Sequence, residues 1–235
     1  MERIRLNIVL HKIVEDEQEI QSRYDTIAEF AYDLVRQLQS IVRGSSIELD
    51  IFLDDGYQSQ FSFALRLARE YDNQIFIPLI TQLIGTDGYI SHKEIEVLKQ
   101  EENIILCSHG VSHAALGVYE NDTVLPTPQG GIYRNMSMGH NSILTEQEIQ
   151  FQLKESYRQL SELGIQTDTF VYPYGIYSEY ILSIVEHSGV YAKAYTCDDG
   201  LEQVGVRSLA IPRLLIDNTL SISEWVKKAE NIVKR

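Results

Sequence analysis

Two adjacent aspartates followed by a glycine form the most unusual short sequence in the chain. In Ile51-Phe-Leu-Asp-Asp-Gly-Tyr57, the carboxyl groups of Asp54 and Asp55 come where a hydrophobic run ends. Two carboxylates buried side by side raise each other's pKa, so the pair is costly unless a cation lies between them. A solvated Asp-Asp-Gly turn accounts for the same residues without any chemistry, and the pair alone does not decide between these interpretations.

Two histidines four residues apart follow another apolar run. They are His109 and His113 in Ser108-His-Gly-Val-Ser-His113, and their spacing predicts that they share one face of a helical turn, close enough to bind one metal ion. Gly110 follows His109, where the helix of zinc proteases carries its glutamate base, so a base must come from elsewhere. The aspartate pair can supply both a base and a third ligand, and the two features together favour a metal site.

Two further segments attract attention. Phe170-Val-Tyr-Pro-Tyr-Gly175 also ends a short apolar run, and it is either a plain aromatic turn or one wall of a pocket with a backbone N–H held in place. Residues 117–144 have few apolar residues in series, which predicts a long irregular loop. A loop of that length inside a compact domain is usually functional or mobile.

The elements that position these residues are short apolar runs of strand length, which alternate with amphipathic stretches. Apolar residues recur at helical spacings over 27–42 and 149–163, and capping-box patterns at Thr145–Glu148 and Ser221–Glu224 begin helices. This alternation predicts a single α/β domain over residues 1–235, with a mainly parallel sheet that is open or closed into a barrel. The predicted strands are Leu6–Leu10, Ile47–Leu53, Ile75–Ile80, Ile104–Cys107, Thr169–Tyr172, Ala192–Thr196 and Val206–Ile216.

Charge and composition exclude several classes of function. The 235 residues carry a formal net charge of -14, which argues against binding to nucleic acid or to an anionic membrane surface, because both call for basic patches. Cys107 and Cys197 lie far apart and, without a secretory signal, are expected to be reduced thiols. No run approaches the roughly 20 apolar residues of a membrane span. We therefore expect a cytoplasmic protein, of an oligomeric state that the sequence does not reveal.

Over most of its length the chain resembles the polysaccharide deacetylases, carbohydrate esterase family four, which share the NodB homology domain. Asp54-Asp55-Gly56-Tyr57 is similar to the family's first motif, His109 and His113 to its His-x-x-x-His motif, and Tyr172-Pro-Tyr-Gly175 to its third. The resemblance implies a distorted (β/α)7 barrel and a divalent metal, zinc first, with cobalt, nickel or manganese as alternatives. The candidate residues all follow predicted strands, where barrels of this kind build active sites.

The resemblance also implies a role for each residue. Asp55, His109 and His113 hold the metal, and Asp54 is the general base. The backbone N–H of Tyr174 helps to stabilise the oxyanion. The residues implied to contact the substrate are Tyr57, Tyr172, Pro173 and Gly175.

Two departures from the family matter. Many members carry an arginine in the third motif that holds the catalytic aspartate, and Val171 stands at that position; many have a C-terminal histidine as general acid, and Ile211–Asp217 contains none. A branch that includes poly-N-acetylglucosamine deacetylases has a histidine after its first strand instead. His11 is therefore the candidate acid, and Arg213 the candidate that orients Asp54. The other histidines, interpreted as structural or solvated, are His92, His187 and His140, of which His140 could reach a substrate.

The expected reaction is metal-dependent hydrolysis of an N-acetyl group on an amino sugar or a sugar conjugate. A cytoplasmic enzyme would meet a nucleotide-linked or lipid-linked sugar rather than a finished polymer. Two alternatives stay open. One is hydrolysis of another small amide or imide on the same scaffold. The other is a binding protein that has lost turnover, which the missing motif arginine and C-terminal histidine bring into consideration.

Overall fold

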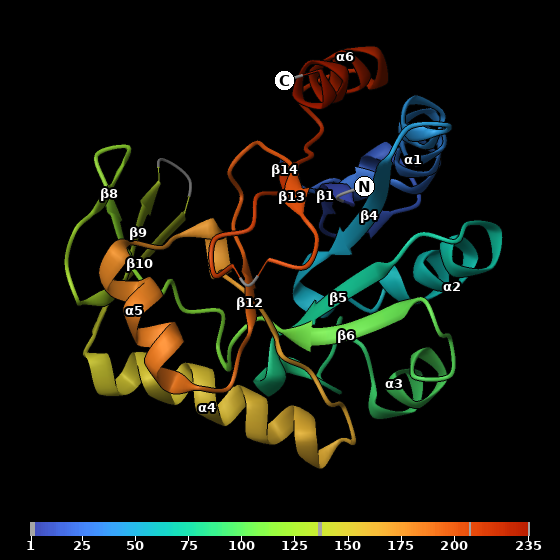
Figure 1. Cartoon of the computed structure of the whole chain (residues 1–235). Helices are drawn as coiled ribbons and strands as arrows, with labels where there is room; N and C mark the ends of the chain where they lie inside the picture. The colour runs from blue at the N-terminus through green and yellow to red at the C-terminus, as the bar shows by residue number, and fades with distance from the viewer. Residues whose placement is uncertain (1–2, 136–137, 207, 235) are drawn as a thin grey trace.

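The computed structural model describes residues 3–135, 138–206 and 208–234, with the side chains of residues 134–141 left out. Among the described residues, the parallel strands form one curled sheet in the order β12-β11-β6-β5-β4-β1, with β14 also on β1 (Figure 1). This confirms the predicted α/β barrel. The strands are β1 (Ile4–Leu10), β4 (Ile47–Leu53), β5 (Ile75–Leu79), β6 (Ile104–Ser108), β11 (Thr169–Val171), β12 (Lys193–Tyr195) and β14 (Leu214–Leu215), and β13 (Glu202–Gln203) pairs antiparallel with β1.

A short segment near the C-terminus brings the two edges of the sheet together. Ile211 forms a parallel bridge with Tyr195 at the β12 edge, and Leu214 pairs with Ile8 of β1. The backbone N–H of Ile211 donates to the Ala194 carbonyl at 2.9 Å. Arg213 lies between these two contacts, so the closure of the barrel fixes its backbone.

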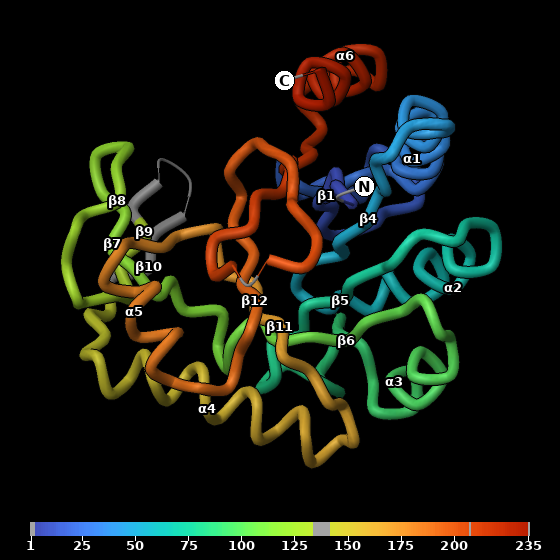
Figure 2. Tube along the Cα trace, viewed as in Figure 1, coloured from blue at the N-terminus to red at the C-terminus, as the bar shows by residue number. Residues whose placement is uncertain are grey.

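The α-helices lie around the outside of the sheet (Figure 1). The capping boxes predicted at Thr145 and Ser221 are present and begin α4 and α6. Figure 2 shows α6 beside α1, which brings the C-terminal helix close to the start of the chain. No helix of the described residues has the length and apolar character needed to cross a membrane. The helices are α1 (Ala28–Val42), α2 (Gln60–Glu70), α3 (His92–Leu98), α4 (Glu146–Glu162), α5 (Glu179–Ser188) and α6 (Ile222–Val233).

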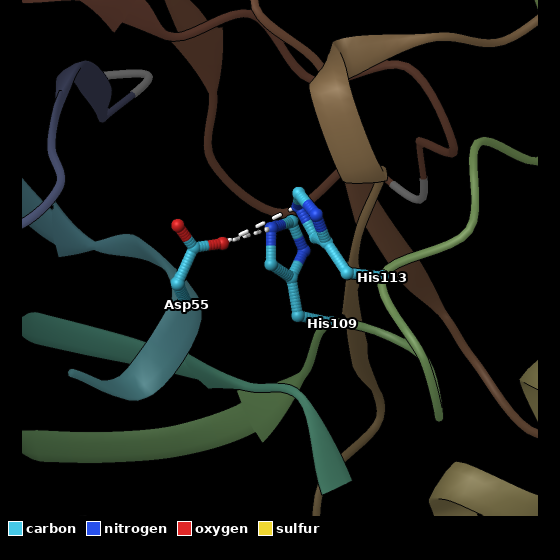
Figure 3. Close-up of side chains that lie close together, drawn as sticks. All are labelled: Asp55, His109 and His113. Atoms are coloured by element: carbon cyan, nitrogen blue, oxygen red, sulfur yellow. Dashed lines mark ion pairs between the residues drawn. The ribbon is translucent and has the colours of Figure 1, made fainter. Parts of the chain in front are cut away.

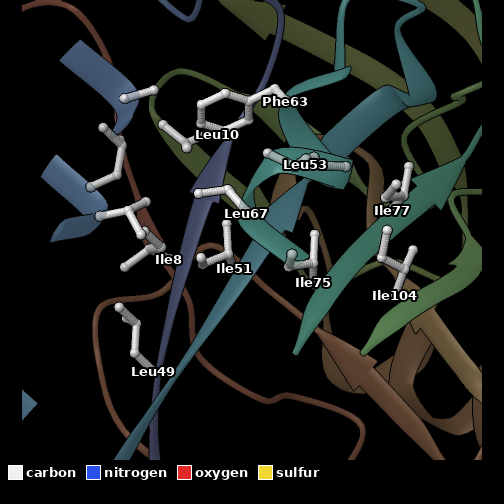
Figure 4. Packing of buried hydrophobic residues seen from close by; sticks show 14 of the residues in the cluster. Ile8, Leu10, Leu49, Ile51, Leu53, Phe63, Leu67, Ile75, Ile77 and Ile104 are labelled. Atoms are coloured by element: carbon white, nitrogen blue, oxygen red, sulfur yellow. The ribbon is translucent and has the colours of Figure 1, made fainter. Parts of the chain in front are cut away.

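Alternation along the strands decides which side chains face the helices. In β4, Leu49, Ile51 and Leu53 point outward and pack in one cluster with Phe63 and Leu67 of α2 (Figure 4). Each is buried, and burying such a side chain stabilises the fold by about 1.5–3 kcal/mol. The β4 residues between them point into the barrel.

The barrel interior is filled by one residue from each parallel strand or from the closing segment. Phe52 and Phe76 stack with ring centroids 4.4 Å apart, and the ring of Tyr195 lies 4.7 Å from that of Phe52. These packed rings make the interior a solid core and not a channel. The inner layer consists of Val9, Phe52, Phe76, Cys107, Val171, Tyr195 and Ile211.

The interior next to the amino ends of the strands is polar. Arg5 is 8% exposed and pairs with Asp50 at 3.1 Å and with Glu48 at 3.0 Å. Burial raises the pKa of Asp50 to about 7, because Arg5 offsets the cost only in part and Glu202 and Glu48 add negative charge nearby. One arginine therefore faces more carboxylates than it can balance.

Two predictions about elements are wrong. Residues 117–144, expected to be irregular, form a four-stranded sheet in the order β10-β9-β7-β8. Asn121 and Asp122 form the turn between β7 and β8 with φ of 52° and 58°, and hairpin turns that need positive φ favour these two residue types. The strand expected over Val206–Ile216 shrinks to β14, since Pro212 has no N–H to donate to a ladder. The smaller strands are β2 (Ile13–Val14), β3 (Thr26–Ile27), β7 (Val118–Glu120), β8 (Thr123–Leu125), β9 (Gly130–Asn135) and β10 (Met138–Leu144).

Candidate active site

Strand geometry places the predicted site residues together above the inner layer. Because side chains alternate along a strand, the residue two places beyond an inner-layer residue again points into the barrel, now at the carboxyl end. This relation accounts for four of the predicted residues at once. They are His11, Asp54, His109 and Arg213, which follow Val9, Phe52, Cys107 and Ile211.

The metal ligands predicted from the sequence converge on one carboxylate oxygen. The Nε2 atoms of His109 and His113 lie 3.4 Å and 3.3 Å from Oδ1 of Asp55 (Figure 3). That oxygen is buried and accepts no hydrogen bond from the described residues. The three side chains offer ligand atoms that all lie within 4.8 Å of one another.

These distances fit a divalent ion. Zinc–nitrogen and zinc–oxygen bonds of about 2.0–2.2 Å in a tetrahedral site put neighbouring ligand atoms about 3.3 Å apart. One carboxylate and two imidazoles are also the donor set of a catalytic site, which leaves a position for water or substrate. Cys197 lines the same cavity, but burial raises the pKa of its thiol to about 11, so it does not offer a thiolate at neutral pH.

The histidines present the nitrogen that a metal needs. Nδ1 of His109 lies 2.8 Å from the carbonyl oxygen of Val171, which can only accept, so Nδ1 carries the proton and Nε2 keeps its lone pair. Burial lowers the pKa of His113 to about 4, with Asp55 acting in the opposite direction, so this imidazole is neutral at pH 7. Val171, where many relatives have an arginine, thus contributes through its backbone.

Asp54 is held by Arg213. Nη1 and Nη2 of Arg213 donate to Oδ1 and Oδ2 of Asp54 at 2.8 Å and 3.0 Å, and Nε donates to the carbonyl of Thr196 at 2.8 Å. Burial alone would raise the pKa of Asp54, but Arg213 and the imidazoles of His109 and His11 outweigh it and lower the pKa. Asp54 therefore stays ionised in a nearly dry position, 2% exposed.

Gln60, at the first turn of α2, ties two strand ends together. Its Nε2 donates to the carbonyl of His11 at 2.9 Å and to the carbonyl of Asp54 at 2.6 Å. It is fully buried. The backbone positions of the candidate acid and the candidate base are therefore coupled through one side chain, which the sequence reading did not single out.

Three site residues have left-handed backbone conformations. Asp55 has φ of 80°, His113 of 57° and Tyr174 of 59°, and each such non-glycine residue costs of order 1–3 kcal/mol. The prediction that His109 and His113 share a helical turn is wrong. Gly110, with φ of 79°, and His113 both have left-handed conformations, which a right-handed helical turn does not contain, so no helix forms after β6. The histidines meet through a loop instead.

A cavity of about 310 Å³ opens at this end of the barrel, within the range of small-molecule sites. Of the residues predicted to contact substrate, Tyr57, Tyr172 and Gly175 line it, whereas Pro173 is buried in the turn; Tyr174, predicted to help stabilise the oxyanion, lines it too. A Cβ on Gly175, whose φ is 67°, would lie 2.7 Å from Cβ of Cys197, so only glycine fits there.

Stacked tyrosines form two walls of the cavity. Tyr57 stacks on Tyr89 at 5.3 Å, and Tyr174 stacks on Tyr133 of β9 at 4.3 Å between ring centroids. His11 also lines the cavity, with its ring 5.3 Å from Tyr24. The sequence reading missed the lining residues on loops and on the small sheet, which no local pattern ties to the site. They include Tyr24, Asp25, Tyr89, Tyr133 and Cys197.

Two of the remaining histidines, His92 and His187, lie away from the site. His187 closes α5, where its Nδ1 lies 2.6 Å from the Ser183 carbonyl. His92 begins α3 beside Gly85. The prediction for His140 falls on a side chain outside the described residues.

Comparisons with known proteins identify the family and the fold of the chain. Residues 46–192 match the family model described as polysaccharide deacetylase. No curated protein sequence matched the chain.

Solved structures share the fold. A polysaccharide deacetylase from Bacillus cereus superposes with a TM-score of 0.71 at 14% identity, over 97% of this chain and 69% of that one. The deacetylase PplD of Streptococcus pyogenes, in complex with acetate, gives 0.70 at 16% identity, over 97% and 99%. A de-N-acetylase from Aggregatibacter actinomycetemcomitans gives 0.70 at 14% identity, over 96% and 99%.

Proposed function

The chain belongs to the polysaccharide deacetylase family, and from this premise we propose that it is a metal-dependent hydrolase that removes the N-acetyl group from an amino sugar or sugar conjugate. The observation that carries the proposal is the convergence of Asp55, His109 and His113 on one buried carboxylate oxygen. The second is Asp54 beside them, ionised and held by Arg213.

The metal would be held by Asp55, His109 and His113, with zinc the first candidate. A divalent ion in such a site supplies a Lewis acid that polarises an acetyl carbonyl and makes water more acidic. The neutral imidazole of His113 and the fixed tautomer of His109 suit this role.

Asp54 acts as the general base. It takes a proton from the water that attacks the acetyl carbon, so that a C–O bond forms. Proton transfer of this kind is typically worth about 10²–10⁴-fold in rate. Arg213 keeps the carboxylate in place through two parallel hydrogen bonds, the geometry that fixes a carboxylate most firmly.

His11 gives a proton to the nitrogen as the C–N bond breaks, and the products are acetate and a free amine. It lines the cavity, and it lies close enough to Asp54 and Asp55 to lower the pKa of both. The backbone N–H of Tyr174, in a turn at the cavity, helps to hold the negative charge that develops on the acetyl oxygen. His11 thus supplies the acid, and Arg213 the arginine that orients the base. Many family members carry these two groups at other positions, where this chain has neither.

Two of the structural neighbours support an N-acetyl group as the group that is hydrolysed, because one is a de-N-acetylase and another was solved with acetate. Stacked tyrosines along the cavity suit the apolar face of a sugar ring. A cytoplasmic location stays a prediction.

The test is a screen of acetate release. The purified protein, treated with a chelator and then given zinc or cobalt, is incubated with N-acetylglucosamine oligosaccharides, nucleotide-linked N-acetylglucosamine and small amides without a sugar. We expect metal-dependent release of acetate from an N-acetylated sugar. Release from none of the sugars in the presence of metal, or equal release in its absence, would contradict the proposal.

A further inference from the structure

The bend at residues 110–113, which joins the two histidine ligands, has a shape that a helix would not give it. His109 directly follows β6, whereas His113 lies at the far end of the bend, where Gly110 and His113 have φ of 79° and 57°. A non-glycine residue stays in the left-handed region only where its surroundings hold it there. The contacts that hold the bend therefore decide where the imidazole of His113 lies.

The carbonyl groups of the bend are held by backbone N–H groups. The N–H of Thr81, which follows β5, donates to the carbonyl of Gly110 at 3.1 Å. The next N–H, that of Gln82, donates to the carbonyl of Val111 at 3.1 Å. The course of the main chain thus fixes this side of the bend.

The N–H groups of the bend depend on one side chain. The amide oxygen Oε1 of Gln152, on α4, accepts from the N–H groups of Val111 and Ser112 at 3.0 Å and 3.1 Å. Gln152 is 8% exposed. An amide oxygen has two lone pairs, and the two N–H groups use both. Because both partners are donors, the oxygen and not the NH₂ group of the amide must face the bend.

Two buried hydroxyl groups fix α4 against the start of the bend. Ser108 Oγ accepts from the N–H of Gly110 at 3.2 Å and donates to Ser156 Oγ at 2.8 Å. The hydroxyl of Ser156 donates in turn to the backbone carbonyl of Gln152 at 2.7 Å, and both serines are fully buried. Gln152 and Ser156 lie one turn apart on the same face of α4. The helix therefore presents Gln152 to the bend from a fixed position.

His113 needs this support more than the other histidine ligand does. The imidazole of His109 is fixed by the hydrogen bond between its Nδ1 and the Val171 carbonyl. The ring of His113 packs against the rings of Tyr174 and His109, with centroids 4.4 Å and 4.7 Å away. Ring packing is less directional than a hydrogen bond, so the backbone of the bend decides how well Nε2 of His113 faces Oδ1 of Asp55, 3.3 Å away.

We propose that Gln152 is a positioning residue, whose side-chain oxygen holds the bend and thereby sets His113 in the geometry that a divalent metal requires. The proposal rests on the metal site of the function proposed above, and it adds a residue of α4 on which that site depends. Groups that orient metal ligands typically account for about 10- to 100-fold in metal affinity.

Gln152→Met tests the proposal, because methionine keeps the length of the side chain and removes the amide oxygen. We expect this variant to bind zinc about 10- to 100-fold more weakly, measured by competition with a colorimetric chelator. The visible absorption of the cobalt-loaded protein, which reports the geometry of the ligands, should change as well. Gln152→Glu keeps an oxygen that accepts from both N–H groups and should regain most of the zinc affinity.

Gln147→Met is the matched control, since it makes the same substitution at an exposed position of the same helix. It should leave the zinc affinity and the cobalt spectrum as in the wild type. Urea unfolding of each metal-free variant separates a change in the metal site from a loss of stability alone. Lower stability of Gln152→Met with unchanged zinc affinity would make Gln152 a structural residue and overturn the proposal, as would a Gln152→Glu variant that binds zinc equally weakly.

Hydrogen exchange of the metal-free wild type tests the same contacts without a substitution. The amide hydrogens of Val111 and Ser112 should exchange slowly, because they are bonded to a buried acceptor, and exchange as fast as in an open loop would contradict the proposal. Acetate release separates the two proposals. If the wild type binds zinc and releases no acetate, the deacetylase function fails, and the zinc affinity of the Gln152 variants still tests the positioning role.

Discussion

Replacing Arg213 by methionine should show how much the Arg213–Asp54 ion pair contributes to the free energy of unfolding. The side chain of Arg213 is 0% exposed and that of Asp54 3% exposed, and the pair is joined by two hydrogen bonds. Removing one partner of a buried ion pair typically costs about 3–5 kcal/mol, because the other charge is left without compensation. For a chain of this length, that lowers Tm by roughly 6–20 °C.

The double variant Asp54→Asn with Arg213→Met makes the reasoning sharper. Replacing both members leaves a neutral amide beside an apolar side chain, so the double variant should be more stable than Arg213→Met alone. Urea unfolding of metal-free protein, followed by circular dichroism, gives the free energies of unfolding. Arg36→Met, which breaks an exposed pair with Asp33, serves as control and should cost less than about 1 kcal/mol. A loss below about 1 kcal/mol in Arg213→Met, or a double variant less stable than it, would refute the argument.

Three more predictions concern single residues. His11→Ala should lower kcat on an N-acetyl substrate by about 10²–10⁴-fold at unchanged metal content and much less on an activated ester; equal effects on both would make His11 structural. Gln60→Leu leaves two buried carbonyls without donors, so chemical unfolding should show a loss of about 1–3 kcal/mol or more, and no loss would remove its coupling role. Asp50 has a folded pKa of about 7, above its unfolded value of 3.8, so it contributes stability that is present below pH 4 and lost as pH rises through 7. Asp50→Asn should therefore flatten the fall of unfolding free energy between about pH 4 and 7, and an unchanged slope there would contradict that pKa.

The sequence was sufficient for the parts of the site that lie at strand ends. Asp54 and His109 each follow an apolar strand at the spacing that points a side chain into the barrel. Strand periodicity is local, so it can be read from one segment at a time. The same holds for the helix starts at Thr145 and Ser221, where a cap and its partner lie three residues apart.

The missed parts depend on contacts between distant segments. Tyr133 lines the cavity because the small sheet places it on Tyr174, where the two rings stack. No local pattern within residues 117–144 predicts this contact. Asp25 lies in a segment placed by Asn218, 193 residues away. The bend between His109 and His113 does not follow from their spacing, because a separation of four residues fits both a helical turn and a loop in which Gly110 and His113 have left-handed conformations.

The measurement that tests the central claim most directly is the metal content of the wild type, Asp54→Asn and Asp55→Asn after zinc loading and removal of free metal. Asp55 offers a buried oxygen to the ion, whereas Asp54 is occupied by Arg213. We predict about one zinc ion per chain in the wild type and in Asp54→Asn, and clearly less in Asp55→Asn. A wild type without stoichiometric metal, or equal losses in both variants, would contradict the assignment of Asp55, His109 and His113 as the metal site.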